Sequence, residues 1–457
     1  MNGISRRNLL QSAACGFGWL ATQGILAGAT GQWAIQPPQF PAKAKRVIFL
    51  FMHGGPSQMD LFDYKPLLTR DSGKPSPIPK PRVVSSATGN LLGSPFKFKQ
   101  HGQSGAWVSE LLPNIASVSD KLCFLNGVHC SNSRHGGALL ELHTGSDTFI
   151  RPSIGSWVSY GLGSECSDLP AFLTLAPTLS HGGVNNYASA FLPATHQGVP
   201  LGSASVGAEK ARIPFIEGGP ARGEQMAEMD LLAHFNQVHG AQAGFDPRLE
   251  GQVAAMEMAF RMQGVAPAVQ DLTMETKETK TAYGLDDPVT KNYGQLCLMA
   301  RRFIERGVRF VQVTHSYKWD QHDRLRADLS RNCQEIDRPV AALIQDLDRR
   351  GLLEDTLVWW GGEFGRTPVA EGGDGRDHNP HGFTHFLAGA GVKPGFRYGS
   401  TDDYSYYAVD GKVHFHDLHA TILHLLGMDH LRLTYRHAGR NFRLTDVHGE
   451  IVSPILT

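Results

Sequence analysis

Carboxylate and imidazole side chains gather in three short stretches of the C-terminal third of the chain. Asp320 and His322 lie in 319–322, Glu363 lies in the glycine-rich 361–366, and the neighbours Asp377 and His378 lie in 375–381. Mixed carboxylate and imidazole ligands suit zinc, manganese or iron better than the all-oxygen cages of calcium. The sequence therefore predicts an enzyme with a metal site. The expected cofactor is a divalent metal, with zinc, manganese and calcium left open.

The spacing of the two Asp and His pairs favours ligation of one ion. Asp320 and His322 are two residues apart after a strand-like run, so in extended backbone both side chains can point to one side. Asp377 and His378 stand in a loop flanked by glycine, whose backbone freedom lets neighbouring residues reach one cation. The alternatives are a loop Asp paired with a loop His, and a His-rich surface loop.

Glu363 and Arg366 follow a strand-like run, in a segment whose glycines permit a tight turn. We predict Glu363 as a further ligand, and Arg366 as the clamp of an oxyanion through the fork of donors on its guanidinium. A structural Glu–Arg salt bridge is the alternative. Asp60, which follows Gly54-Gly55, is predicted as another ligand.

A polar cluster at 130–135 is the place where a reacting group is expected. Cys130, Ser131, Ser133 and His135 all have suitable chemistry, and the sequence does not choose among them. A buried structural Cys with a capping Ser is the alternative. His135 or a neighbour is predicted as the reacting group.

Short runs of β-branched and aromatic residues recur along the chain. Continuous apolar runs of this length are typical of strands covered on both faces. The predicted strands are 46–52, 122–126, 172–176, 308–314, 356–360 and 383–388. Two helical patterns, 295–306 and 325–350, end at Gly307 and Gly351, and Pro339 is expected to kink or restart the second helix.

This alternation predicts an α/β fold with a doubly wound, mainly parallel sheet and helices on both faces. In such sheets, sites gather beyond the carboxyl ends of the strands. The predicted site residues follow strands as this rule requires, because Asp320 and His322 come after 308–314 and Glu363 comes after 356–360.

The length of 457 residues favours one large domain, which we place at 40–457. Residues 64–106 are rich in Pro, Gly, Ser and Lys and predict an irregular insertion, and 195–290 are expected to form a cap over the site. Basic and acidic residues number 43 each, so charge gives no reason to expect nucleic acid or an anionic membrane as partner. A small molecule or a glycan fits better.

Arg6 and Arg7 stand directly before a moderately apolar stretch that reaches Ala27-Gly28-Ala29. This pattern predicts a twin-arginine export signal over 1–29, and hence a periplasmic or secreted protein. A buried N-terminal helix is the alternative. No other stretch is long and apolar enough to span a bilayer. The cysteines show no C-x-x-C spacing and predict no disulfide framework.

The chain also resembles a known family, the exported bacterial proteins of domain of unknown function family 1501. The resemblance covers nearly the whole chain after the signal. Its motifs are GGPS-x-x-D-x-FD at 54–63, YGL at 283–285, ARRFIERGVRFV at 300–311, WD-x-H at 319–322, EFGRTP at 363–368, GRDHN at 375–379, DLHATILHLLG at 417–427 and GRNFRLT at 439–445.

That family is grouped with the alkaline phosphatase and sulfatase superfamily, so the resemblance implies a doubly wound sheet with metals at the carboxyl ends of its strands. It also implies displacement at phosphorus or sulfur on one or two metals. Asp320 and His322 resemble the Asp and His that hold one superfamily metal. The segment 130–134 departs from the sulfatase pattern Cys-x-Pro/Ala-x-Arg, since Asn132 stands at its third position.

The sequence therefore predicts an exported, metal-dependent hydrolase of sulfate or phosphate esters, whose partner is a small-molecule or polysaccharide ester. The expected site consists of Asp60, Asp320, His322, Glu363, Asp377 and His378 as metal ligands, with His135 and Arg366 as catalytic groups. The alternative is a catalytically degenerate superfamily member that binds a glycan or a protein, because the standard nucleophile is missing.

Overall fold

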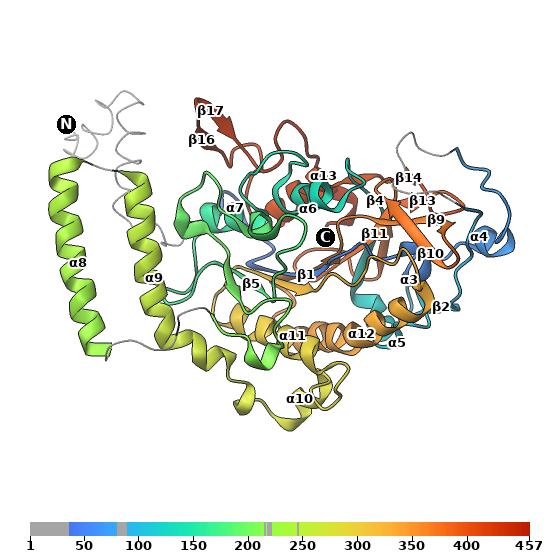
Figure 1. Ribbon diagram of the computed structural model, residues 1–457, viewed down its shortest axis with the longest axis horizontal. Coiled ribbons are helices and arrows are strands. Elements are labelled where there is room, and N and C mark those ends of the chain that lie inside the picture. The colour runs from blue at the N-terminus through green and yellow to red at the C-terminus, as the bar shows by residue number, and fades with distance from the viewer. Residues whose placement is uncertain (1–35, 80–88, 214–215, 217–221, 245) are drawn as a thin grey trace, which may run out of the picture.

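A computed structural model describes residues 36–79, 89–213, 216, 222–244 and 246–457 (Figure 1). The expected export signal at 1–29 lies outside these residues. The strands are β1 (Arg46–Met52), β2 (Phe98–His101), β3 (Ala106–Ser109), β4 (Leu122–His129), β5 (Phe172–Leu175), β6 (Val199–Leu201), β7 (Phe310–His315), β8 (Thr356–Gly361), β9 (Gly365–Glu371), β10 (Gly375–Asn379), β11 (Phe383–Ala388), β12 (Phe396–Tyr398), β13 (Ser400–Thr401), β14 (Ala408–Asp410), β15 (Val413–His414), β16 (Tyr435–His437) and β17 (Arg440–Phe442). The helices are α3 (Gln58–Leu61), α4 (Pro66–Arg70), α5 (Pro113–Ser117), α6 (His135–Thr144), α7 (Ile154–Leu162), α8 (Arg222–Ala243), α9 (Pro247–Gln270), α10 (Lys277–Ala282), α11 (Lys291–Glu305), α12 (Leu325–Arg349) and α13 (Phe415–Leu425).

One nine-stranded sheet forms the centre of the fold, in the order β12-β4-β11-β8-β1-β7-β5-β6, with β15 beside β4. Strands β8, β1, β7, β5 and β6 pair in parallel, and β11 runs antiparallel to both β8 and β4. The predicted α/β fold with a mainly parallel sheet is confirmed.

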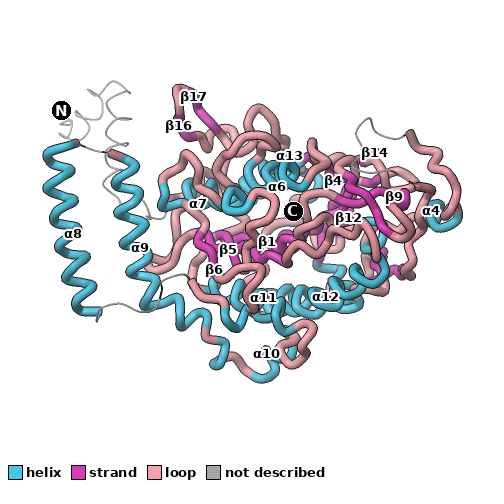
Figure 2. Tube along the Cα trace, in the orientation of Figure 1, coloured by secondary structure: helices cyan, strands magenta, loops and turns pink. Residues whose placement is uncertain are grey.

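Helices cover both faces of this sheet, as Figure 2 shows. On β1, Ile48 and Leu50 join an apolar cluster with side chains of α11 and α12. The alternate residues Val47 and Phe49 join a second cluster with side chains of α6, α7 and α13. Because successive side chains of a strand point to opposite faces, a continuous apolar run is the expected signature of a sheet buried on both sides.

The structure agrees closely with the predicted strands and helices. β1 and β11 have the predicted bounds, whereas β4 continues to His129 and β7 begins at Phe310. The expectation of a restart at Pro339 is wrong, because α12 is one helix from Leu325 to Arg349. The cysteines of the described residues are all free, in line with the absence of a disulfide framework.

The boundaries of the domain, the insertion at 64–106 and the cap at 195–290 stay predictions. The segment 64–106 contains α4 and β2, and β2 pairs with β3 as a small separate ribbon. In the segment 195–290, α8 and α9 stand side by side at one end of the molecule, with α9 nearer the sheet (Figure 1). Among the described helices, none has the length together with the apolar character that crossing a membrane demands.

Candidate metal centre

The carboxyl ends of four strands bring the candidate residues to one edge of the sheet. β1, β7 and β8 are parallel neighbours, and β4 shares their direction because both β4 and β8 are antiparallel to β11. His135 begins α6 after β4, Asp320 and His322 follow β7, and Glu363 follows β8. His378 reaches the same place from β10, which forms a hairpin with β9.

Four of these side chains converge on one point. The Oδ1 atom of Asp320 lies 3.2 Å from Nε2 of His135, 2.9 Å from Nε2 of His322 and 3.1 Å from Nε2 of His378. The ligand atoms of all four residues lie within 4.8 Å of one another. Three imidazoles and one carboxylate are a ligand set suited to zinc and similar transition metals.

The other ring nitrogen of each imidazole is held by an acceptor. Nδ1 of His135 lies 2.6 Å from Oε1 of Glu363, and Nδ1 of His378 lies 2.8 Å from the main-chain oxygen of Ser133. Nδ1 of His322 contacts the carboxylate of Glu371. An acceptor at Nδ1 places the proton there and leaves the lone pair on Nε2, which is how proteins orient metal-binding histidines.

The contact between two imidazoles supports the same interpretation. Nε2 of His322 and Nε2 of His378 are 3.0 Å apart, although both Nδ1 atoms face acceptors. The hydrogen bond to Asp320 raises the pKa of His322, which favours a proton on its Nε2, between the two rings and the carboxylate, when no ion is bound. A divalent metal can take the place of that proton, so the residues present fit such an ion.

The carboxylate and imidazole groups of the cluster lie so close together that they shift one another's pKa values. Burial raises the pKa of Asp320, but hydrogen bonds from His135, His322 and His378 prevail and bring it well below its usual range. Burial lowers the pKa of His135, yet its contacts with Asp320 and Glu363 outweigh burial and raise it to about 9. In the absence of an ion, His135 therefore carries the proton that compensates the two carboxylates.

Glu363 lies behind His135, where it orients the ring. Its two oxygens accept hydrogen bonds from the main-chain nitrogen of Gly54 at 3.0 and 3.1 Å, and Oε1 contacts Nδ1 of His135. Burial raises the pKa of Glu363, but the hydrogen bond to His135 and the charge of that ring prevail and lower it to about 2. The carboxylate is thus ionised and supports a ligand.

The guanidinium of Arg366 is fully buried, and all of its nitrogens are engaged. Nε donates to the Gly55 oxygen at 2.9 Å, Nη1 donates to the Arg376 oxygen at 3.1 Å, and Nη2 reaches Oδ1 of Asp320 at 2.6 Å. Nη2 also contacts the main-chain oxygens of Gly54 and Trp319. Few donors are left for a substrate oxyanion, so the geometry favours a role in holding Asp320.

Asp60 and Asp377 occupy different surroundings from the four converging residues. Asp60 is buried and accepts from Nε of Arg376 at 2.7 Å and from the Ser57 hydroxyl at 2.5 Å. Its partner is therefore a guanidinium. Asp377 belongs to a separate group with His322 and Glu371, whose ligand-type atoms lie within 4.8 Å of one another. This group adjoins the cluster through His322.

The Cys130 thiol and the Ser131 hydroxyl have partners outside the four converging residues. Burial raises the pKa of the Cys130 thiol well above its usual value, and Sγ contacts the main-chain oxygens of Asn132 and Glu363. The Ser131 hydroxyl donates to Glu141 at 2.7 Å. Ser133 contributes its main-chain oxygen to His378. A thiol that keeps its proton is a poor nucleophile.

Three further side chains, outside the predicted set of ligands and catalytic groups, lie beside the cluster. His53, directly after β1, is fully buried, and neither of its ring nitrogens has a hydrogen-bond partner among the described residues. His181 forms a second potential ligand group with His53 and His135, and the Tyr317 hydroxyl contacts Asp320. The position of His53 after a strand was a usable signal, whereas His181 lies in an irregular segment that carries none.

Burial lowers the pKa of His53 to about 4 and also lowers the pKa of His181, so both rings are neutral at neutral pH. The two potential ligand groups share His135. Because Nδ1 of His135 is taken by Glu363, only Nε2 can bind an ion, and it can serve only one of the groups. The group that contains the Asp320 carboxylate is a better ligand set than the group of His53, His135 and His181.

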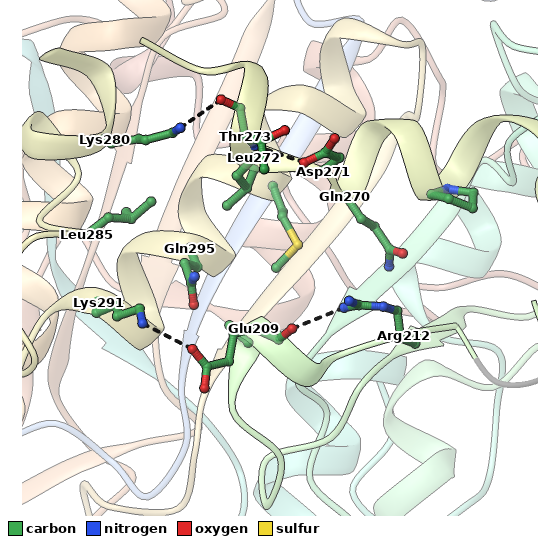
Figure 3. A pocket seen from close by; sticks show the side chains of 13 residues that line it. Glu209, Arg212, Gln270, Asp271, Leu272, Thr273, Lys280, Leu285, Lys291 and Gln295 are labelled. Carbon is green, nitrogen blue, oxygen red and sulfur yellow. Dashed lines mark hydrogen bonds and ion pairs between the residues drawn. The ribbon is translucent and has the colours of Figure 1, made fainter. Parts of the chain in front are cut away.

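A cavity of about 490 Å³ lies elsewhere, between α9, α10 and α11, and contains none of the predicted site residues (Figure 3). Its charged side chains are already paired. Lys291 lies 3.1 Å from Glu209, Lys280 donates to the Thr273 oxygen at 2.8 Å, and Arg212 donates to the Glu209 oxygen at 3.2 Å. The groups suited to metal binding or catalysis therefore lie at the edge of the sheet and not in this cavity.

The profile of the family Protein of unknown function (DUF1501) matches residues 44–456. The chain belongs to this family. The match spans the sheet, the helices on both faces and the four converging residues His135, Asp320, His322 and His378. No curated protein matches the chain in sequence.

Solved structures with a similar fold include the lipoteichoic acid synthase LtaP from Listeria monocytogenes, at 10% identity over 92% of this chain and 78% of that chain, with a TM-score of 0.38. The PsFucS1 sulfatase from Pseudoalteromonas sp. is 13% identical over 84% and 68%, with a TM-score of 0.34. The alkaline phosphatase from the Antarctic bacterium TAB5 is 10% identical over 86% and 99%, with a TM-score of 0.33.

Proposed function

We propose that this protein is an exported, metal-dependent hydrolase of sulfate or phosphate esters. The observation that carries the proposal is the convergence of Asp320 with the Nε2 atoms of three imidazoles, each oriented by an acceptor at Nδ1. His135, His322, His378 and Asp320 would hold the ion. A divalent metal bound there supplies Lewis acidity, which polarises an ester oxygen and activates water.

The surrounding residues of the chain support this chemistry by position and charge. Glu363 and Glu371 keep His135 and His322 in the ligating tautomer, and Arg366 fixes the Asp320 carboxylate. His53 is neutral and has unused ring nitrogens, so its N–H can donate to a substrate oxygen. Since His135 belongs to the ligand set, we assign to His53 the role of a hydrogen-bond donor to the substrate.

Tyr317 lies beside the cluster with its side chain 37% exposed, and its hydroxyl contacts Asp320. We take this side as the entrance of the site. An ester group that enters there meets His53 and His181, which both face Tyr317 with ring centroids 4.8 Å away. Three rings around an entrance suit the sugar of a polysaccharide ester as well as a small aryl ester. The substrate class proposed is therefore an ester carried on a flat or cyclic group.

One observation favours a second candidate function, a module that binds a glycan or a protein without turnover. The Ser131 hydroxyl donates to Glu141, and the Cys130 thiol keeps its proton. Neither of these two groups is then available to form a covalent intermediate.

Metal analysis and ester hydrolysis of the purified chain test both candidates. The wild-type protein should contain one equivalent of a divalent metal and hydrolyse an aryl sulfate or an aryl phosphate. His322→Ala and His378→Ala should lose the metal, and kcat/KM should fall by more than about 100-fold, the upper end of effects from residues that only orient a ligand.

His381→Ala is the matched control, because His381 lies three residues after His378 but contacts Tyr406 and Tyr407. It should keep both metal and turnover. Bound metal without turnover on either ester would support the binding module. Full activity in metal-free protein would refute the proposed hydrolase.

A further inference from the structure

Helix α8 has apolar side chains on two opposite faces. Met229, Leu232 and Ala233 line an apolar groove of about 270 Å³ between α8 and α9. A second stripe consists of Leu231, Phe235 and Val238, which follow one another at i, i+4 and i+7 and so share one face.

This second stripe, the α8 stripe, is open to solvent. Its side chains are 54%, 58% and 43% exposed at Leu231, Phe235 and Val238 respectively. At about 100° per residue, the stripe lies on the side of α8 opposite Met229, which lines the groove. Figure 1 shows α8 at the outer edge of the molecule, so the stripe faces away from α9. A helix that is apolar on two opposite faces is expected to be covered on both.

The charges of α8 disfavour an anionic membrane as the cover. The helix carries Glu224, Glu228 and Asp230 against the single basic residue Arg222, and it contains no lysine. Helices that lie on anionic lipid place Lys and Arg along their polar face. An acidic helix is repelled from such a surface.

The same charges are arranged so that α8 complements itself. The acidic residues all lie in its N-terminal half, whereas His234 and His239 lie in its C-terminal half. None of the ion pairs found in the described part of the chain involves Glu228 or His239. A two-fold axis pairs identical surfaces, and two helices related by an axis perpendicular to them run antiparallel. The acidic half of each helix then meets the histidine half of the other.

We propose that the α8 stripe is an interface with a second copy of this chain. The two α8 helices pack antiparallel about a two-fold axis near Phe235. Helical geometry then sets Leu231 against Val238 of the other copy, and brings Glu228 beside His239 of the other copy. The interface covers the second apolar face of α8.

The size of the stripe predicts a weak dimer. The 22 residues of α8 span about 33 Å. A face about 10 Å wide and of this length offers roughly 330 Å², compared with about 800 Å² per partner in a standard stable interface. We therefore expect dissociation in the micromolar range, visible as a mass that depends on concentration.

Sedimentation of the full chain over a range of concentrations tests the interface. The wild type should move from monomer to dimer as its concentration rises. Phe235→Glu should remain a monomer at every concentration. Met226→Glu changes an exposed residue on another side of α8 and should dimerise like the wild type. Circular dichroism and metal content should be the same in all three proteins.

Disulfide cross-linking tests the antiparallel register. Phe235→Cys lies next to the proposed axis and should give a covalent dimer under mild oxidation, while Met226→Cys should not. A wild type that stays monomeric, or a dimer that Phe235→Glu leaves intact, would overturn the proposal. A monomer that sediments with phosphatidylcholine vesicles would also overturn it and would assign the stripe to a lipid surface.

Discussion

A single acceptor at Nδ1 decides the tautomer of each imidazole in the cluster. Glu363, Glu371 and the Ser133 main-chain oxygen each occupy one Nδ1 atom, which leaves three Nε2 atoms and the Asp320 carboxylate facing a common point. The ligands therefore need little rearrangement to accept an ion. Preorganised ligands bind more tightly because less ordering remains to be done.

Glu363→Gln should weaken metal binding by about 10- to 100-fold without unfolding the protein. The amide keeps the shape of the side chain but lacks the charge that supports His135 through a 2.6 Å contact. Titration of the metal-free protein with zinc, followed by calorimetry, measures the change. Glu354→Gln, at an exposed position, is the control. If Glu363→Gln bound zinc with unchanged affinity, Glu363 would have no part in metal binding.

Metal binding should strengthen as pH rises toward 9. The pKa of His135 is raised to about 9 in the metal-free site, so below that pH an incoming ion must displace a proton. The apparent affinity should therefore rise by up to about tenfold per pH unit and level off above pH 9. Calorimetry at several pH values, in buffers with different enthalpies of ionisation, counts the protons released. His135→Gln should remove this part of the pH dependence, and an unchanged slope in that variant would contradict the assignment.

At the scale of elements, α12 is attached to the loop that carries Asp320. Glu335 of α12 lies 2.9 Å from Nε2 of His315, at the end of β7, and 2.6 Å from Nζ of Lys318 in the loop. Burial raises the pKa of Glu335, but its bonds to His315 and Lys318 prevail and lower it to about 2. Its carboxylate thus connects a helix, a strand and a ligand-bearing loop.

Glu335→Gln should destabilise the protein at neutral pH and do so less in acid. The folded-state pKa of about 2 lies below the ordinary value of 4.5, so the stabilisation is fully present above about pH 4.5 and is lost as pH falls toward 2. The expected loss at pH 7 is about 1–2 kcal/mol, after allowance for partial screening by solvent. Urea unfolding at pH 7 and pH 3.5 measures it, with Glu354→Gln as control. An equal difference at both pH values would show that the charge of Glu335 is not the cause.

At the scale of the whole molecule, a metal at the cluster would connect segments that are far apart in the sequence. Its ligands come from the start of α6, from the loop after β7 and from β10. An ion that binds only the folded state stabilises it by mass action, by about 4 kcal/mol at a free concentration 1,000 times Kd. The metal is therefore expected to stabilise the fold as well as to serve the reaction.

Removal of the metal should lower Tm by several degrees. Differential scanning calorimetry of the wild type before and after treatment with a chelator measures the shift, and addition of zinc should restore the original value. His322→Ala should melt at the lower temperature in both conditions, because it lacks a ligand. A chelator that lowers the Tm of this variant as much as that of the wild type would place the stabilising ion elsewhere.

Strands and their direction could be predicted from the sequence because their apolar runs are continuous. β1 and β11 have the bounds that the pattern predicts, and the alternation of strands with helices is enough to indicate parallel pairing. The same reasoning brings Asp320, His322 and Glu363 to one edge of the sheet, since they follow strands. Such apolar runs can be recognised in the sequence because burial on both faces requires an apolar side chain at each position of the strand.

The division of the site into ligands and supporting groups needed the tertiary structure. Glu363 and Asp60 have the same kind of side chain as Asp320, yet one lies behind His135 and the other pairs with Arg376. The main-chain oxygen of Ser133, which orients His378, has no signature in the sequence. Residue types and spacing determined which chemistry was available and on which edge of the sheet. Which atoms share one point depends on contacts across more than 200 residues, such as those of His135 with Glu363 and of Ser133 with His378, and only the folded chain determines those.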